Sequence, residues 1–132
     1  DEIQASLLNT KLKYLDEWNK VRREIAKEYS ENLKNVKIPK EMSYGKHVYH
    51  LYVIRHKNRD KLKEYLTKNE IGNQIHYPIP VHLQKAYSFL KYKRGSLPIT
   101  EKVCKEILSL PLYPELKRSE VEKIIKVINS FK

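Results

Sequence analysis

Residues 2–34 carry an apolar stripe that no proline or glycine interrupts. This spacing, in steps of three and four residues, predicts one long amphipathic helix over residues 2–34. A stripe of this length needs a longer partner surface than a small domain offers, so we expect part of it to pack on something outside the chain. A coiled-coil dimer is the alternative, although the steps depart from strict heptads. The stripe consists of Leu8, Leu12, Leu15, Trp18, Val21, Ile25, Tyr29 and Leu33.

Two later stretches have the composition of strands. Residues 47–56 are rich in β-branched and aromatic side chains and predict a strand. Gly72 permits a turn into a second strand that ends at Tyr77. His47 and His50 would lie on opposite faces of the first strand, because side chains alternate along a strand. We therefore interpret both histidines as structural groups rather than as ligands of a shared metal.

Helical patterns fill most of the remaining sequence, so helices outnumber strands. At 132 residues the chain fits one domain. We expect an α+β fold in which helices pack on one side of a short, mainly antiparallel sheet. The last helix should bury Val121, Ile124, Ile125, Ile128 and Phe131. The predicted helices are residues 59–69 capped by Asn58, a short piece over residues 84–90, one capped by Thr100 with Val103, Ile107 and Leu108 facing inward before Pro111 and Pro114, and a last one capped by Ser119.

The net charge of +11 comes from 27 basic residues that are scattered among apolar positions. No block of five or six like charges occurs, and no zinc-finger or RNA-binding motif is present. This distribution indicates a solvated surface, with a minority of the charges steering an anionic substrate. A stand-alone basic module that binds nucleic acid or another anionic partner is the alternative.

The single cysteine and the absence of long apolar runs indicate the cellular setting. Cys104 lies on an amphipathic segment, so we expect a buried structural thiol and neither a disulfide nor a cysteine-rich metal site. No apolar run approaches the ~18 residues of a membrane span. We therefore expect a cytoplasmic protein without a membrane partner.

Residues 75–84 (IHYPIPVHLQ) hold the most concentrated set of hydrogen-bonding side chains around two prolines. Each proline stiffens the backbone and favours an extended conformation before it. Burying unpaired polar groups is costly, so His76, Tyr77, His82 and Gln84 are candidates to face a cleft, a ligand or a neighbouring chain. The alternative is an irregular connection whose polar groups meet water or backbone.

No self-contained active site is visible. The sequence has no Gly-x-Ser-x-Gly elbow, no His-Glu-x-x-His motif and no glycine-rich phosphate loop. No lysine lies in an obviously apolar segment that would lower its pKa. We expect no catalytic residue, no cofactor-binding residue and no metal ligand in this chain.

Five collinear segments resemble the small domain of DegT-type sugar-nucleotide aminotransferases, which are fold-type I enzymes dependent on pyridoxal phosphate. The resemblance covers essentially the whole chain in the right order. The third segment is similar to the substrate-facing loop of that family. The segments are DEIQA at residues 1–5 with LDEWN at 15–19, HVYHLYVIR at 47–55, IHYPIPVHLQ at 75–84, LPITE at 97–101 and LSLPLYP at 108–114.

The resemblance implies that residues 1–132 form one C-terminal small domain of a larger aminotransferase. Residues 1–34 would be a long linking helix and residues 35–132 an α+β body. The cofactor, pyridoxal 5'-phosphate, would be bound mainly by a preceding large domain that supplies the Schiff-base lysine. The fragment alone would be inactive, and the complete enzyme would be a homodimer.

The pattern in residues 75–84 is similar to enzymes that aminate the 3-keto group of dTDP-linked 6-deoxyhexoses. The resemblance therefore implies transfer of an amino group from a donor, usually glutamate, to a nucleotide sugar, with the cofactor as electron sink. His76 and Tyr77 would bind the hexose or diphosphate, followed by His82 and Gln84. Nucleic acid and membrane are not expected as partners. Some members of the family use the same cofactor for dehydration, which is the alternative within the family.

Glu70 is a departure from the family pattern, which often has glycine at this point before an isoleucine. The departure affects only a turn between a helix and a strand. We expect Asn69 or Gly72 to supply the backbone freedom that this turn requires.

Overall fold

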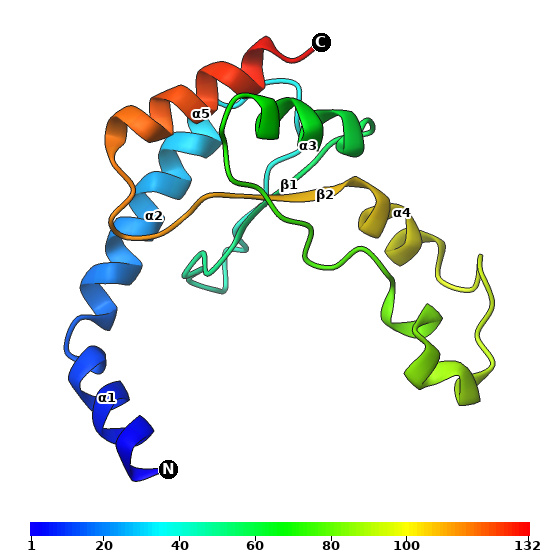
Figure 1. Ribbon diagram of the computed structural model, residues 1–132, viewed down its shortest axis with the longest axis horizontal. Coiled ribbons are helices and arrows are strands. Elements are labelled where there is room, and N and C mark those ends of the chain that lie inside the picture. Colours follow the sequence, from blue (N-terminus) through cyan, green and yellow to red (C-terminus); the bar gives the residue numbers. More distant parts are fainter.

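The computed structural model describes residues 1–132. Its helices cluster around a two-stranded antiparallel sheet, so the α+β expectation is confirmed (Figure 1). The elements are α1 (Glu2–Leu12), α2 (Leu15–Asn32), β1 (Tyr52–Arg55), α3 (Arg59–Lys68), the 3₁₀ helices η1 (Val81–Leu83) and η2 (Lys85–Leu90), α4 (Pro98–Glu106), β2 (Ile107–Leu110) and α5 (Arg118–Ser130).

The core lies on one face of the β1–β2 pair. Tyr52 lies opposite Leu110 and Ile54 opposite Leu108 in the antiparallel register. Paired residues share a face, so these four side chains point the same way, and all four are buried. Helices α2, α3 and α5 cover this face; they contribute Ile25, Ala26, Tyr29, Leu62, Leu66, Val121, Ile124 and Ile128 to the same cluster.

The predicted core face of the last helix is confirmed for three of its five residues, and its predicted cap is wrong. Ile125 and Phe131 are only partly buried, and Phe131 follows the helix. Val121, Ile124 and Ile128 are buried in α5. The helix begins at Arg118, and Ser119 lies within its first turn. The amide of Lys117 donates to Glu120 Oε2 at 2.9 Å, which satisfies the backbone at the start of the helix. Glu120, at the third helical position, thus accepts the backbone hydrogen bond at the start of the helix, and Ser119 does not cap it.

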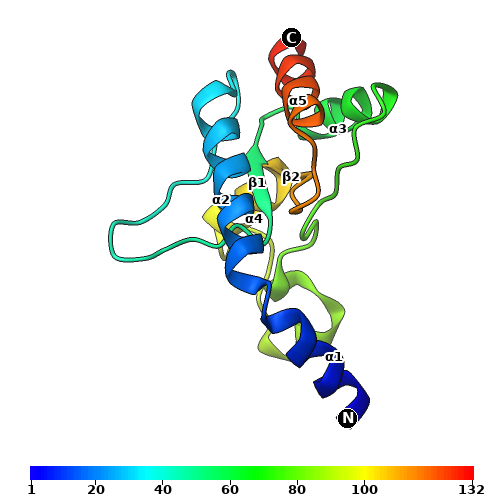
Figure 2. The same ribbon diagram turned by 90° about the vertical axis from the view of Figure 1, so that its left-hand side faces the viewer.

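The single helix predicted over residues 2–34 is wrong in one respect, because the chain turns between α1 and α2. The Tyr14 amide donates to the carbonyl of Lys11, three residues back, at 3.0 Å. The Tyr14 ring stacks on Trp18 with centroids 5.8 Å apart. Helix α1 buries no residue, so burial in the core does not hold it in line with α2. Figure 2 shows α1 extending beyond the rest of the molecule.

The strand predicted over residues 47–56 is shorter than expected. Only Tyr52–Arg55 form β1. Tyr49 has a φ of 49°, in the left-handed region, which ends the extended conformation before it. Its amide donates to His47 Nδ1 at 2.8 Å, so a side chain takes the place of a ladder partner.

The second strand was predicted in the wrong segment. The expected strand ending at Tyr77 is reduced to one isolated bridge between Gln74 and Ser109. The true partner of β1 is β2, which lies in residues predicted to be helical. The apolar run of β2 is too short for its periodicity to separate strand from helix, so pairing with β1 decides its conformation.

Helix α4 begins and ends earlier than predicted. Pro98 occupies its first turn, where a missing amide hydrogen costs nothing, so Thr100 is not the cap. Cys104 is half-buried rather than buried. The buried Arg59 holds the end of α4, because its Nη1 donates to the carbonyls of Cys104 at 3.3 Å and Ile107 at 3.1 Å.

Glu70 itself supplies the turn after α3. Its φ is 61°, and the amide of Ile71 donates to the carbonyl of Leu66 at 2.9 Å. This is the hydrogen bond that closes a helix with a left-handed residue after its cap. The prediction that Asn69 or Gly72 would take this role is therefore wrong.

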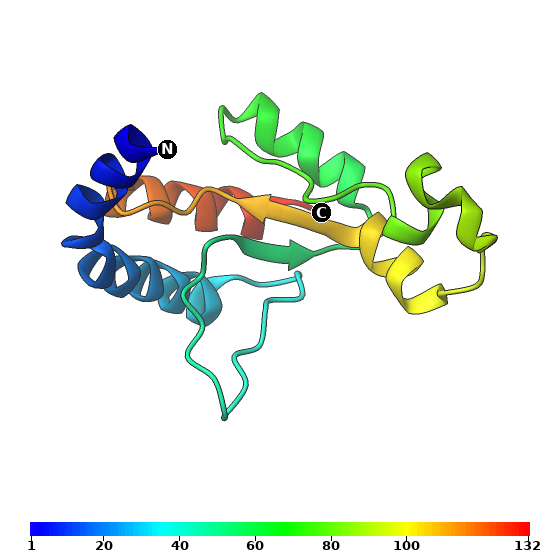
Figure 3. The same ribbon diagram turned by 90° about the horizontal axis from the view of Figure 1, so that it is seen from below.

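Residues 77–99, which we call the arm, leave the body of the fold and return through α4 (Figures 1 and 3). The short helical piece predicted over residues 84–90 is confirmed as η2. No helix of the chain is both long and apolar enough to cross a bilayer. The arm exposes many large apolar side chains: Tyr77, Ile79, Val81, Phe89, Leu90, Tyr92, Leu97 and Ile99.

Candidate substrate-facing site

The four residues predicted to bind a ligand do not converge on one point. His76 is half-buried, and its Nδ1 lies 2.9 Å from Ser109 Oγ. Tyr77 is 71% exposed, so its ring is available to a partner. Gln84 lies over the arm, with its Nε2 3.5 Å from the carbonyl of Ile79. Of the four, only His76 and Tyr77 are neighbours whose side chains a ligand could both reach.

His76 lines a hollow of about 370 Å³ beside β2. The walls come from the residues before β1, from the bridge segment around Gln74 and from the end of β2. Apolar walls are supplied by Leu51, Leu110 and Leu112, and the hydrogen-bonding side chains are those of His50, Asn73, Gln74, His76 and Ser109. A small set of polar groups among apolar walls is typical of a site that orients a small molecule. This hollow is the candidate site.

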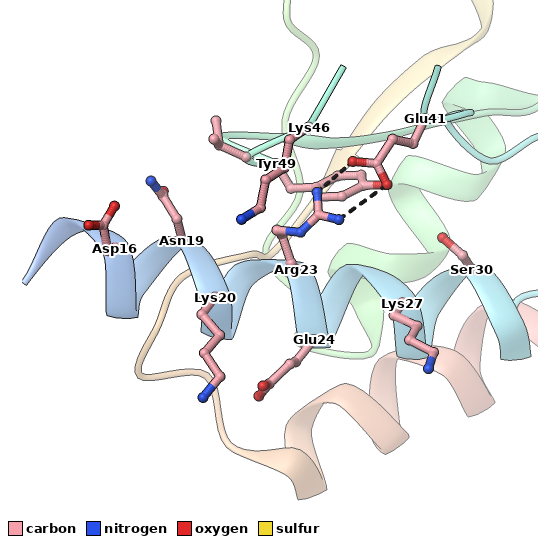
Figure 4. Close-up of a pocket in the computed structure, with 11 residues that line it drawn as sticks. Asp16, Asn19, Lys20, Arg23, Glu24, Lys27, Ser30, Glu41, Lys46 and Tyr49 are labelled. Atoms are coloured by element: carbon pink, nitrogen blue, oxygen red, sulfur yellow. Dashed lines mark hydrogen bonds and ion pairs between the residues drawn. The ribbon is translucent and has the colours of Figure 1, made fainter. Parts of the chain in front are cut away.

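A larger hollow of about 790 Å³ lies between α2 and the loop that precedes β1 (Figure 4). Arg23 and Glu41 pair across it through two hydrogen bonds. The amide of His47 donates to Glu41 Oε1 at 2.7 Å, and Arg23 Nη1 donates to the carbonyl of His47 at 2.6 Å. These bonds fasten the loop to α2, and the prediction that His47 is structural is confirmed.

The same ion pair sets the titration of both partners. The hydrogen bond from Arg23 and the amide of His47 hold the pKa of Glu41 below its usual value, against the opposing effect of desolvation. The hydrogen bond to Glu41 raises the pKa of Arg23. Both groups are therefore charged at neutral pH, and the loop stays fastened there.

The backbone reversal at Tyr49 separates the two hollows. Val48 and Tyr49 line the larger one, whereas His50 and Leu51 line the smaller one. The left-handed Tyr49 thus directs successive side chains to different sides. His50 was predicted to be a structural group; it is exposed and lines the candidate site instead.

His82 lines neither hollow but braces the arm. It is buried, and its Nε2 lies 3.2 Å from Glu101 Oε1. The same carboxylate oxygen accepts the amides of Gly95 at 2.8 Å and Leu97 at 3.4 Å. Burial acts to raise the pKa of Glu101, but the Gly95 amide, His82 and the Leu97 amide outweigh it and lower the pKa.

The chain holds no complete site for a metal or for pyridoxal phosphate. No three His, Cys, Asp or Glu side chains are placed to hold a metal ion. A lysine that reacts as an amine needs a desolvated surrounding, and no lysine in the chain is buried. The residues present do not fit the cofactor by themselves, and no chemical step through it follows from this chain.

Three residues of the site region were not predicted to be site residues from the sequence: Ser109, His50 and Glu101. Ser109 has a usable signal, because it is one polar residue between the leucines of a short apolar run before a proline. A polar side chain at such a position is expected to have a specific hydrogen-bond partner. For Glu101 neither its residue type nor its spacing signals its role, because its partners His82, Gly95 and Leu97 all lie in the arm.

Comparison with known proteins gives a consistent result. Residues 1–129 match the DegT/DnrJ/EryC1/StrS aminotransferase family. The chain is 44% identical over 133 residues to dTDP-3-amino-3,6-dideoxy-alpha-D-galactopyranose transaminase of Aneurinibacillus thermoaerophilus, covering 99% of this chain and 36% of that protein. It is 35% identical over 134 residues to dTDP-3-amino-3,4,6-trideoxy-alpha-D-glucose transaminase of Streptomyces venezuelae, covering 99% of this chain and 35% of that protein.

Solved structures agree with the sequence comparison. DesV of S. venezuelae, crystallised in complex with a ketimine intermediate, superimposes with a TM-score of 0.93 at 36% identity, over 98% of this chain and 36% of that one. A DegT/DnrJ/EryC1/StrS aminotransferase from Brucella abortus gives a TM-score of 0.88 at 40% identity, over 97% and 35%. The chain thus spans 36% of the length of the first of these relatives. With its fold and almost all of its sequence matched, the chain belongs to the DegT/DnrJ/EryC1/StrS aminotransferase family.

Proposed function

We propose that the polypeptide containing this chain is a pyridoxal-phosphate-dependent aminotransferase acting on a nucleotide-linked keto-6-deoxyhexose, with dTDP as the nucleotide and glutamate as the amino donor. The observation that carries the proposal is the family match over residues 1–129. Two relatives named for dTDP-linked 3-amino sugars support the choice of substrate.

Within that enzyme, residues 1–132 are proposed to form the lobe on the substrate side. Residues 1–34, as α1 and α2, link this lobe to the cofactor-binding part, and residues 35–132 form its body. Leu8 and Leu12 of α1 are 66% and 63% exposed, which suits a helix that packs on another lobe or on a second subunit. The enzyme is proposed to be a homodimer.

His76 and Tyr77 are the proposed contacts to the hexose or diphosphate. His76 presents a ring nitrogen to the candidate hollow, and Tyr77 presents a nearly free phenol beside it, with ring centroids 5.6 Å apart. Gln84, which lies over the arm, is a more distant candidate. His82 is proposed to act by holding the arm in place, because it is buried and its Nε2 pairs with Glu101.

A stand-alone module for nucleic acid is supported less well. Such a module would use a continuous basic face and would leave the histidines and tyrosine of residues 75–84 inside the core. His76 instead lines a hollow and Tyr77 is exposed. Binding of DNA or RNA that falls steeply with salt would favour the module.

The test uses the full-length polypeptide with pyridoxal phosphate, glutamate and a dTDP-3-keto-6-deoxyhexose. We expect a yellow protein that forms the amino sugar, and a dehydrated sugar as product would favour the dehydratase. His76→Ala should raise KM for the nucleotide sugar about tenfold, the cost of one hydrogen bond to a charged or polar ligand, with unchanged cofactor uptake. His56→Ala, the same change away from both hollows, is the control. An unaltered KM in His76→Ala would remove this residue from the site.

A further inference from the structure

Ser109 is a buried polar side chain that the proposed function does not yet use. It is 4% exposed and lies in the middle of β2, opposite Val53. Because side chains alternate along a strand, its hydroxyl points away from the core face that carries Leu108 and Leu110. It therefore points to the side of the sheet where the candidate hollow lies.

The hydroxyl of Ser109 has one hydrogen-bond partner in the chain, His76 Nδ1 at 2.9 Å. The backbones are also joined two residues earlier, since the amide of Ser109 donates to the carbonyl of Gln74 at 2.8 Å and the amide of Gln74 donates back at 3.3 Å. Backbone and side chain together fix the position of the His76 ring relative to β2.

The direction of the hydrogen bond follows from the choice of acceptors. A buried hydroxyl hydrogen without an acceptor costs about 1–3 kcal/mol. His76 Nδ1 is the one hydrogen-bond partner that the chain gives the Ser109 hydroxyl, and on this ground the serine is assigned as the donor and the histidine as the acceptor. A neutral imidazole that accepts at Nδ1 carries its proton at Nε2. His76 is thereby set as a donor at Nε2, which makes no hydrogen bond inside the chain.

We infer that Ser109 is a positioning residue that fixes the tautomer and the orientation of His76, so that Nε2–H is presented to an oxygen of the sugar or diphosphate. The inference deepens the proposed function and rests on it. It explains why a polar residue interrupts the apolar run of β2. It also assigns His76 the role of a neutral hydrogen-bond donor rather than that of a base.

The kinetic test compares Ser109→Thr with Ser109→Val in the full-length holoenzyme. Threonine and valine have nearly the same shape and both suit a strand, but only threonine keeps the hydroxyl. We expect Ser109→Val to raise KM for the nucleotide sugar about tenfold with little change in kcat, and Ser109→Thr to stay within about twofold of wild type. Equal KM values for the two variants would overturn the inference.

A double-mutant cycle separates positioning from a general structural effect. In a His76→Ala background, the change from threonine to valine at Ser109 should no longer alter KM, because the group being positioned is gone. A valine effect that persists at full size in that background contradicts the inference. Cofactor absorbance of every variant is measured alongside and should not change.

A polypeptide that does not transaminate would refute the proposed function but not the positioning role of Ser109. A spectroscopic measurement tests that role independently of activity. Histidine is labelled with ¹⁵N in the full-length polypeptide, and the His76 signals are identified by their loss in His76→Asn. We expect the Nε2–H tautomer in wild type and Ser109→Thr, and a mixed population in Ser109→Val. The Nδ1–H tautomer in wild type would overturn the inference.

Discussion

The body of the fold and the arm are both rich in apolar and aromatic residues, but the body buries these side chains and the arm exposes them. In the body, Tyr52, Ile54 and Leu108 are fully buried. In the arm, Tyr77, Phe89 and Ile99 are 71%, 71% and 79% exposed. The body is thus stabilised by its own hydrophobic core, whereas the arm is held by a few polar contacts around Glu101.

This difference indicates that the body buries its apolar surface within the chain, whereas the arm leaves its apolar surface exposed. A contiguous set of exposed apolar side chains marks a surface that contacts something else. In the proposed enzyme that contact is the remaining polypeptide, the second subunit or the substrate. The body can therefore be understood from this chain alone, and the arm cannot.

The largest expected effect is the loss of stability when a core side chain of the body is truncated, compared with the same kind of truncation in the arm. Leu108→Ala removes a fully buried side chain between β1 and the helices and should lower the free energy of unfolding by about 2–5 kcal/mol. Phe89→Ala in the arm should change it by less than about 0.5 kcal/mol. Urea denaturation measures both, and similar costs for the two variants would contradict the contrast.

A smaller effect tests one buried hydrogen bond of the body. Tyr29 is buried and its hydroxyl donates to the carbonyl of Pro111 at 3.0 Å. Burial and the nearby Tyr52 raise the pKa of this phenol, so it remains a neutral donor. Tyr29→Phe leaves the carbonyl unpaired and should cost about 1–3 kcal/mol. The matched control is Tyr113→Phe, which alters a 43% exposed phenol and should leave the urea midpoint unchanged.

The polar anchor of the arm gives the third prediction. Glu101→Ala removes the acceptor for His82 and for the amides of Gly95 and Leu97. Loss of these hydrogen bonds should speed amide exchange at Gly95 about fivefold, while amides of the sheet keep their protection. The exposed Glu115→Ala serves as the control. Unchanged exchange at Gly95 would show that the arm is held by something else.

The same anchor should respond to acid. The pKa of Glu101 is lowered in the folded chain, so its stabilising effect is complete above the ordinary glutamate pKa of about 4.3. The effect is lost as the pH falls through the lowered folded-state value. Faster exchange at Gly95 should therefore begin only below about pH 4 in wild type, and Glu101→Ala should abolish this pH dependence.

The smallest effect is a gain in stability after α3. Glu70 adopts a φ of 61°, which costs a residue with a side chain about 1–2 kcal/mol relative to glycine. Glycine gives back part of this through its freer unfolded state, so Glu70→Gly should stabilise the fold by about 0.5–1 kcal/mol. Glu70→Ala removes the same side chain without relieving the backbone. Equal urea midpoints for the two variants would exclude strain at this position.

The sequence predicted best where one local pattern decides the structure. The apolar face of α5 and the place of Asn58 just before α3 follow from spacing and residue type alone, although the Asn58 side chain makes no capping hydrogen bond. It failed where a distant partner decides: Ile107–Leu110 become a strand only because they pair with β1. The split between α1 and α2 likewise lies where no core burial fixes the direction of the helix, since α1 buries no residue.

The site was predicted in part for the same reason. His76 and Tyr77 could be singled out, since two prolines keep a polar segment extended and accessible. Whether His82 faces a ligand or a carboxylate depends on Glu101, which lies on another element. Ser109 could be noticed as an unusual polar residue, but its partner required the bridge between Gln74 and β2.

The most direct test of the central proposal is amide hydrogen exchange on the full-length holoenzyme with and without a dTDP-linked 6-deoxyhexose. Gln74, His76 and His50 line the candidate hollow, so ligand should slow exchange in residues 74–77 and around His50 and leave α3 and α5 unchanged. Protection confined to other parts of the polypeptide, with none at His76 and Tyr77, would contradict the assignment of this chain to the substrate side.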